Sequence, residues 1–155
     1  APTTESKQNL IEEKVHGKSF ITGNTVMDSI RQYSKWADRK STLVIDEKNF
    51  ILFTMHRAEN VDDKETISNV FSALIESKER IIIPIHPRTL KRLNEFGIYR
   101  KICNDNNIIL LKSVGYFDIM NLMKKCDYPI FLGSIKNNSI LQVNPNQRME
   151  GFGLV

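Results

Sequence analysis

One pattern constrains the fold of this sequence more than any other feature: four short apolar runs alternate with segments of helical periodicity. The four apolar runs lie at Phe50–Thr54, Ile81–Ile85, Ile108–Leu111 and Tyr128–Leu132. Short apolar runs bounded by turn signals are typical of buried strands. Strands that alternate with helices form a parallel sheet with right-handed crossovers. The sequence therefore predicts an α/β fold in which a parallel sheet is flanked by helices.

Periodicity and capping residues predict where the other elements lie. Helices are expected at residues 3–14, 25–37, 62–75, 87–97 and 116–126. Asp62 and Glu65 have the spacing of a capping box at the start of the third of these helices. A short strand is expected at Phe20–Thr22, and Ile140, Leu141 and Val143 are expected to form one more.

The composition excludes several classes of protein. The 155 residues carry a net charge of +4, but no dense basic stripe with interleaved aromatic residues, so nucleic acid is not an expected partner. The cysteines, Cys103 and Cys126, lack the spacing of a zinc site or a disulfide framework, and reduced thiols suit a cytoplasmic protein. No apolar run reaches the roughly 18 residues of a membrane helix and no signal peptide is visible, so no membrane partner is expected.

Polar side chains follow two of the predicted strands at the point where each strand ends. His56, Arg57, Glu59 and Asn60 follow the first strand, and His86 follows the second, with Arg88 two residues on. Ligands of open α/β sheets bind at the carboxyl ends of the strands. Guanidinium groups suit phosphate, and histidine can transfer a proton or bind a phosphate oxygen. The pattern therefore predicts a phosphate-binding or proton-transferring site at this edge of the sheet.

Structural alternatives exist for these residues. His56 is equally well explained as an ordinary histidine at a strand end, and Arg57 and Glu59 as a surface ion pair that contributes little. Gly133 and Ser134 end the last strand and are a weak candidate for an anion-binding nest. The sequence contains no G-x-G-x-x-G, P-loop or nucleophile-elbow motif.

Several motifs, taken together, resemble one enzyme family. They are Ala1–Glu5, Thr22–Asp28, Thr54–Asn60, Pro84–Pro87 and Gly115–Ile119, and their order and spacing from residue 1 to about 130 are similar to those of the non-hydrolysing UDP-N-acetylglucosamine 2-epimerases. The resemblance implies two Rossmann-like domains that face a cleft, as in the GT-B architecture. It also implies interconversion of UDP-GlcNAc and UDP-ManNAc by elimination and re-addition of UDP, no metal or redox cofactor, and a homodimer.

The resemblance also implies roles for individual residues. His56 matches the active-site histidine of the family, and Arg148 matches an arginine that contacts the nucleotide diphosphate. Ile119 stands where an aromatic residue of the family stacks on uracil. Ser134 begins the segment where the family has its diphosphate-binding loop. Three further residues match a regulatory site of bacterial members: Arg57, Glu59 and His86.

The same resemblance implies that this chain is a fragment. Residues 1–40 correspond to the end of the N-terminal domain and the interdomain connection, and residues 41–155 to part of the C-terminal Rossmann-like domain. The Ser-Gly-Gly loop, the catalytic carboxylates and the C-terminal helices of the family have no counterpart, so the fragment is expected to be inactive alone. A non-catalytic UDP-sugar or phosphate binding module is the alternative function. A relative that hydrolyses UDP-N-acetylglucosamine or transfers a sugar is a third reading, and the Thr22–Val26 motif argues against transfer.

Overall fold

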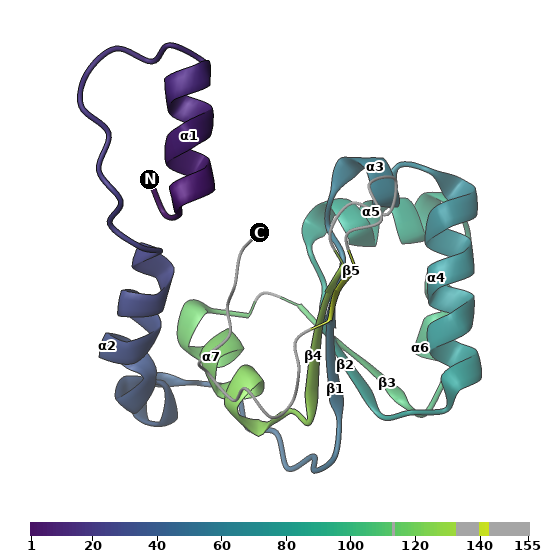
Figure 1. The fold of residues 1–155 in the computed structure, drawn as a ribbon. Helices are drawn as coiled ribbons and strands as arrows, with labels where there is room; N and C mark the ends of the chain where they lie inside the picture. Colours follow the sequence, from purple (N-terminus) through teal and green to yellow (C-terminus); the bar gives the residue numbers. More distant parts are fainter. Residues whose placement is uncertain (113, 133–139, 143–155) are drawn as a thin grey trace.

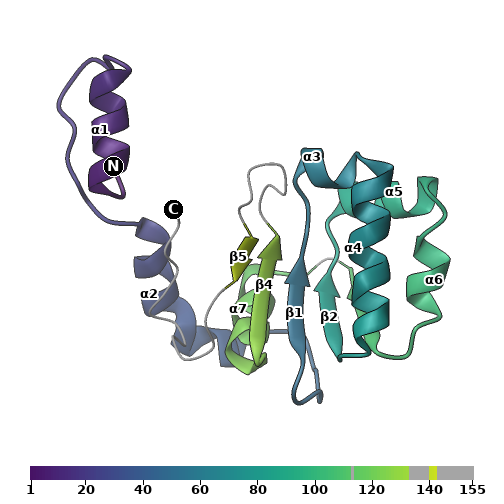
Figure 2. The same cartoon turned by 45° about the vertical axis from the view of Figure 1, so that its right-hand side comes forward.

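The computed structural model of this chain describes residues 1–112, 114–132 and 140–142, and the sheet lies at the centre of the structure. Its strands are β1 (Ile51–Thr54), β2 (Ile81–Pro84), β3 (Ile108–Leu111), β4 (Tyr128–Leu132) and β5 (Ile140–Gln142). Their order is β3-β2-β1-β4-β5. The first four strands are parallel, and β5 pairs antiparallel with β4 (Figure 2). The predicted parallel sheet and its four strands are confirmed.

Helices cover both faces of this sheet (Figure 1). The helices of the described residues are α1 (Thr4–Glu12), α2 (Thr25–Lys40), α3 (Ala58–Val61), α4 (Lys64–Ser77), α5 (Pro87–Glu95), α6 (Tyr99–Cys103) and α7 (Tyr116–Lys125), and α1 lies away from the sheet. On one face lie α4, α5 and α6, and on the other lies α7, which packs in turn against α2. The short helices α3 and α6 were not predicted, because four or five residues are too few to show a helical period.

Alternating residues of the strands supply the two halves of the core. Phe53 and Ile83 point to one face and pack with Phe71 of α4. Leu52 and Ile82, one residue before them, point to the other face and pack with residues of α7. Because successive side chains of a strand alternate between faces, a strand covered on both sides is apolar throughout. This is why continuous apolar runs, and not alternating ones, predicted these strands correctly.

A buried carboxylate fixes the chain between α2 and the sheet. Asp118 accepts hydrogen bonds from the Ser41 hydroxyl (2.8 Å) and from the backbone N–H groups of Thr42 (2.9 Å) and Leu43 (3.2 Å). It also accepts one from the N–H of Gly115 at 2.9 Å. That bond to Gly115, ahead of the others, lowers the pKa of Asp118, while burial opposes the shift. The carboxylate thus joins the start of α7 to residues far away in the sequence.

Two details differ from the sequence predictions, and a third is confirmed in part. Phe20–Thr22 forms no strand; Phe20 and Ile21 are exposed and have no neighbouring strand to pair with in the part of the chain that is described. The helix expected at 62–75 begins after Asp63, whose side chain accepts the N–H of Thr66, so Asp63 and not Asp62 is the capping residue. The predicted strand with Ile140 is confirmed over β5, while Val143 lies outside the described residues.

Candidate functional site

The two histidines that end neighbouring strands lie side by side. β1 and β2 pair in parallel with Ile51 opposite Ile81, so residues 56 and 86, each five positions further on, reach the same level at the carboxyl end. The ring centroids of His56 and His86 are 5.7 Å apart and their planes are inclined by 35°. The prediction that both imidazoles lie on one edge of the sheet is confirmed.

Local hydrogen bonds hold the ring of His86 in place. His86 is the N-cap of α5, and its Nδ1 accepts the backbone N–H of Arg88 at 3.1 Å. Pro87 occupies the first turn, where its missing N–H costs nothing. In the neutral ring an accepting Nδ1 leaves the proton on Nε2. The cap therefore fixes both the orientation and the tautomer of His86.

A second hydrogen bond joins the two histidine-bearing segments. The hydroxyl of Thr89, in the first turn of α5, donates to the carbonyl of Met55 at 2.6 Å. Thr89 is 1% exposed and Met55 directly precedes His56. Because this bond is buried, it is poorly replaced by water and holds α5 against the end of β1. The separation of the two rings is thus set by the fold and not by the rings alone.

His56 has a lowered pKa. Partial burial is the largest cause, because it disfavours the charged ring, followed by the charges of His86 and Arg57. The ordinary value of a histidine is about 6.5. A lower value keeps His56 neutral at pH 7, so its ring can accept a proton or bind an anion through an N–H donor.

The two rings line a pocket of about 490 Å³ at the carboxyl end of the sheet. Three basic side chains line it, His56, His86 and Lys112, which we call the basic rim. Apolar residues also line it, among them Val114 and Ile119, both half-buried. Among the described residues that line the pocket there is no carboxylate. The pocket therefore suits a ligand with a flat or apolar part and an anionic part.

Lys112 was missed at the sequence level. It directly follows β3, as His56 and His86 follow the ends of β1 and β2. The same strand-end argument that selected the histidines would have selected it, but a single lysine after a strand has no motif around it. Its place in the pocket follows from the sheet order, which puts β3 next to β2.

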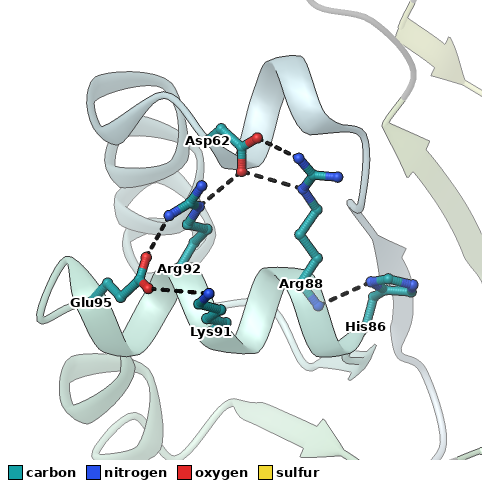
Figure 3. Close-up of polar contacts among 6 residues, drawn as sticks. All are labelled: Asp62, His86, Arg88, Lys91, Arg92 and Glu95. Carbon is teal, nitrogen blue, oxygen red and sulfur yellow. Dashed lines mark hydrogen bonds and ion pairs between the residues drawn. The ribbon is translucent and has the colours of Figure 1, made fainter.

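The arginines do not join the basic rim. Arg88 was expected near the histidines as a phosphate fork, but its guanidinium is turned to Asp62, with Nη2 2.5 Å from Oδ2 (Figure 3). Asp62 also binds Nε of Arg92 at 2.8 Å, and Arg92 binds Glu95 at 2.6 Å. These two arginines, Arg88 first, lower the pKa of Asp62 to about 2. The phosphate-fork prediction for Arg88 is therefore wrong, because a carboxylate already occupies its guanidinium.

The remaining predicted site residues fall into three groups. Arg57 lies 3.9 Å from Glu59, and the Arg57 side chain is 58% exposed, which matches the alternative of a surface ion pair. Asn60, a residue of α3, is fully buried and does not line the pocket. Ser134 and Arg148 lie outside the described residues, so their roles stay predictions.

Neither a metal centre nor a membrane span is found in the described ranges. No group of three or more His, Cys, Asp or Glu side chains within them is arranged to hold a metal ion. No helix within them combines the length and the apolar character needed to cross a bilayer.

Comparison with known proteins gives consistent similarities. A family profile described as UDP-N-acetylglucosamine 2-epimerase matches residues 1–130. A protein of Methanococcus maripaludis named UDP-N-acetylglucosamine 2-epimerase homolog is 39% identical over 126 residues, which cover 78% of this chain and 35% of the relative. The UDP-N-acetylglucosamine 2-epimerase of Methanocaldococcus jannaschii is 38% identical over 139 residues, 82% of this chain and 38% of the relative. This chain thus spans little more than a third of the length of these relatives.

The fold is similar to solved structures of the same kind. The crystal structure of the Methanocaldococcus jannaschii UDP-GlcNAc 2-epimerase in complex with UDP-GlcNAc and UDP matches with a TM-score of 0.76 and 34% identity. The match covers 86% of this chain and 39% of that one. It confirms the predicted fold class, a Rossmann-like parallel sheet that forms part of a GT-B-like architecture.

Proposed function

This chain belongs to the UDP-N-acetylglucosamine 2-epimerase family, and from that premise we propose that it supplies the nucleotide-sugar-binding wall of a UDP-GlcNAc 2-epimerase. The observation that carries the proposal is the pocket that His56 and Ile119 both line. In this proposal residues 1–40 are the end of an N-terminal domain and residues 41–155 part of the C-terminal nucleotide-binding domain.

The proposed reaction interconverts UDP-GlcNAc and UDP-ManNAc. The proton on C2 is removed, the bond from C1 to the diphosphate oxygen breaks, and UDP leaves with the bonding electrons to give a 2-acetamidoglucal. Re-addition of UDP at C1 with return of a proton to the other face of C2 gives the epimer. Since elimination expels a diphosphate, groups that stabilise or protonate the leaving oxygen assist the reaction. His56 is the proposed active-site residue, and the N–H of a neutral ring can stabilise the leaving oxygen by donating a hydrogen bond.

The pocket also suits the parts of the nucleotide. The uracil is proposed to lie against the apolar residue Ile119, with the diphosphate at the basic rim. Ser134 and Arg148 are proposed as further contacts to the diphosphate. Arg57, Glu59 and His86 are proposed as a regulatory or phosphate-binding group, and His86 also contributes to the pocket itself.

A non-catalytic UDP-sugar or phosphate binding module is the second candidate. The absence of a carboxylate among the described pocket residues favours it, because the family resemblance assigns the elimination to catalytic carboxylates. Loss of one general acid or base already costs about 10²–10⁴-fold in rate. This chain alone is therefore expected to bind UDP-sugar with little or no turnover. The homodimer and the cytoplasmic location implied by the family resemblance are part of the first proposal.

Calorimetric titration of this chain with UDP tests both candidates. Binding is expected for the unchanged chain and for His16→Ala, which removes an exposed histidine outside the pocket, and weaker binding for His56→Ala. No heat at millimolar UDP would remove the binding proposal altogether. Incubation with UDP-GlcNAc in D₂O then separates the candidates: deuterium at C2 in the NMR spectrum indicates catalysis, and its absence with intact binding indicates a binding module.

A further inference from the structure

The basic rim extends over three neighbouring strands. The sheet order puts β1, β2 and β3 side by side, and the residues that follow their ends are His56, His86 and Lys112. β2 and β3 pair with Pro84 opposite Leu111, and the N–H of Ile85 donates to the carbonyl of Leu111 at 2.9 Å. Lys112 therefore emerges beside the segment that leads to His86. All three side chains line the same pocket.

Lys112 differs in its contacts from three arginines of the fold. Arg80, Arg88 and Arg92 each bind a carboxylate within the fold. No ion pair or hydrogen bond is found for the side chain of Lys112 among the described residues, and it is exposed at the pocket. The lysine ammonium is a compact positive charge on a flexible stem. Lys112 thus supplies the fixed positive charge of this pocket.

We propose that Lys112 is a specificity-determining residue whose ammonium group binds the diphosphate of the ligand beside the two rim histidines. The inference rests on the proposed function and deepens it, because it names the group that is recognised and a residue that recognises it. An ammonium on a flexible stem binds a phosphate oxygen as a point charge and needs no fixed fork geometry. The apolar lining residues Val114 and Ile119 remain available to the base.

The direct test is calorimetry with UDP on Lys112 variants of the whole chain. Lys112→Ala is expected to weaken UDP binding about tenfold, the usual effect of one charged hydrogen bond. Lys112→Glu is expected to weaken it further, and Lys112→Arg to retain most of it. Lys101→Ala removes an exposed lysine of α6 outside the pocket and is the matched control, with affinity unchanged. Because Lys112 is exposed, circular dichroism and the urea midpoint should match the unchanged chain, so a lost fold cannot imitate the result.

Inorganic pyrophosphate and uridine separate this inference from the proposed function. The Lys112 variants should weaken the binding of pyrophosphate as they weaken the binding of UDP, and should leave any uridine binding unchanged. Pyrophosphate binding that depends on Lys112, with UDP no tighter than pyrophosphate, would support the anion contact and contradict the nucleotide function. UDP binding that is equal in Lys112→Ala, Lys112→Glu and the control would overturn the inference and leave the function standing. No binding of UDP or pyrophosphate at millimolar concentration would overturn both.

Discussion

The basic residues Arg80 and Lys112, at the two ends of the sheet, differ in whether a carboxylate binds them. At the amino end, the guanidinium of Arg80 binds both carboxylate oxygens of Glu47 and the carbonyl of Asn106, with Nε 2.9 Å from Oε2. At the carboxyl end, Lys112 and the two rim histidines line a pocket to which no described carboxylate contributes. The same fold therefore pairs Arg80 with a carboxylate at one end and leaves Lys112 without one at the other among the described residues.

This difference indicates which end is structural and which serves a ligand. A paired cation joins loops: Arg80 and Glu47 tie the residues before β2 to the residues before β1. An unpaired cation stabilises nothing within the fold, but it can attract an anion from solvent. The contrast predicts that substitutions at the amino end reduce stability and spare binding, while substitutions at the rim do the reverse.

The largest expected effect comes from a buried residue at the amino end. Phe50 directly precedes β1, is 1% exposed and packs with Leu52 and Leu122. Phe50→Ala should lower the free energy of unfolding by about 3–5 kcal/mol, because it removes apolar contacts and leaves a cavity. His56→Ala, at the other end of the same strand, should change it by less than about 0.5 kcal/mol. Urea denaturation of both variants measures the two losses of unfolding free energy, and equal losses would contradict the predicted contrast.

A smaller loss of stability is expected when Arg80, the paired cation, is substituted. Arg80→Met keeps the apolar stem but leaves Glu47 and the carbonyl of Asn106 without their donor. The urea midpoint should fall, by less than in Phe50→Ala, while the affinity for pyrophosphate should stay unchanged. Arg100→Met, an exposed arginine of α6, is the control and should leave both quantities unchanged. Loss of pyrophosphate binding in Arg80→Met would show that the two ends are not independent.

The Asp62 network should contribute a pH-dependent share of stability. The pKa of Asp62 is lowered from 3.8 to about 2 in the folded chain. Its contribution is therefore complete above the unfolded value, near 4, and is lost as the pH falls from about 4 to about 2. The difference in urea midpoint between the unchanged chain and Asp62→Asn should be largest at neutral pH and shrink toward pH 2. Asp46→Asn, at an exposed aspartate outside the network, serves as the control; an Asp62→Asn difference that persists undiminished at pH 2 would contradict the account.

The smallest effect concerns the two rim histidines and is read by NMR titration. His56 should titrate below 6.5, because partial burial and then the charges of His86 and Arg57 lower its pKa. His86→Asn removes the neighbouring ring and keeps a residue type that caps helices well. The pKa of His56 should then rise but stay below 6.5, since burial, the largest cause, remains. A pKa of His56 that does not respond would mean that the two rings are electrostatically independent; the exposed His16 gives a reference signal in the same spectra.

Sequence reasoning located the strands and the histidines but not the pairing of charges. Apolar runs and strand-end positions are local features, so β1 to β4 and the His56–His86 pair followed from them. The choice between Asp62 and Asp63 as the capping residue did not, since adjacent aspartates have almost the same spacing to the helix. It was decided by arginines about thirty positions later: Asp62 binds Arg88 and Arg92 and leaves the cap to Asp63.

The arrangement of the strands determines which basic side chains reach the pocket, a point that the sequence left open. Arg88 was expected at the rim because it follows His86 by two residues, yet its side chain turns to α3. Lys112 follows no recognisable motif, yet the pairing of β3 with β2 brings it to the pocket. Sequence distance indicates which residues follow the same strand. Only the three-dimensional structure shows which partners each side chain can contact.

The pairing of β1 with β4 has a consequence for synthesis of the chain. Ile51 pairs with Tyr128, so the central strand lacks one of its two neighbours until residues 77 positions further on have been made. At about 5–20 residues per second, that interval is roughly 4–15 seconds. During it β1 presents an open apolar edge, which other chains can pair with. For several seconds, the nascent chain therefore needs the edge of β1 to be shielded from other chains, until β4 has been synthesised.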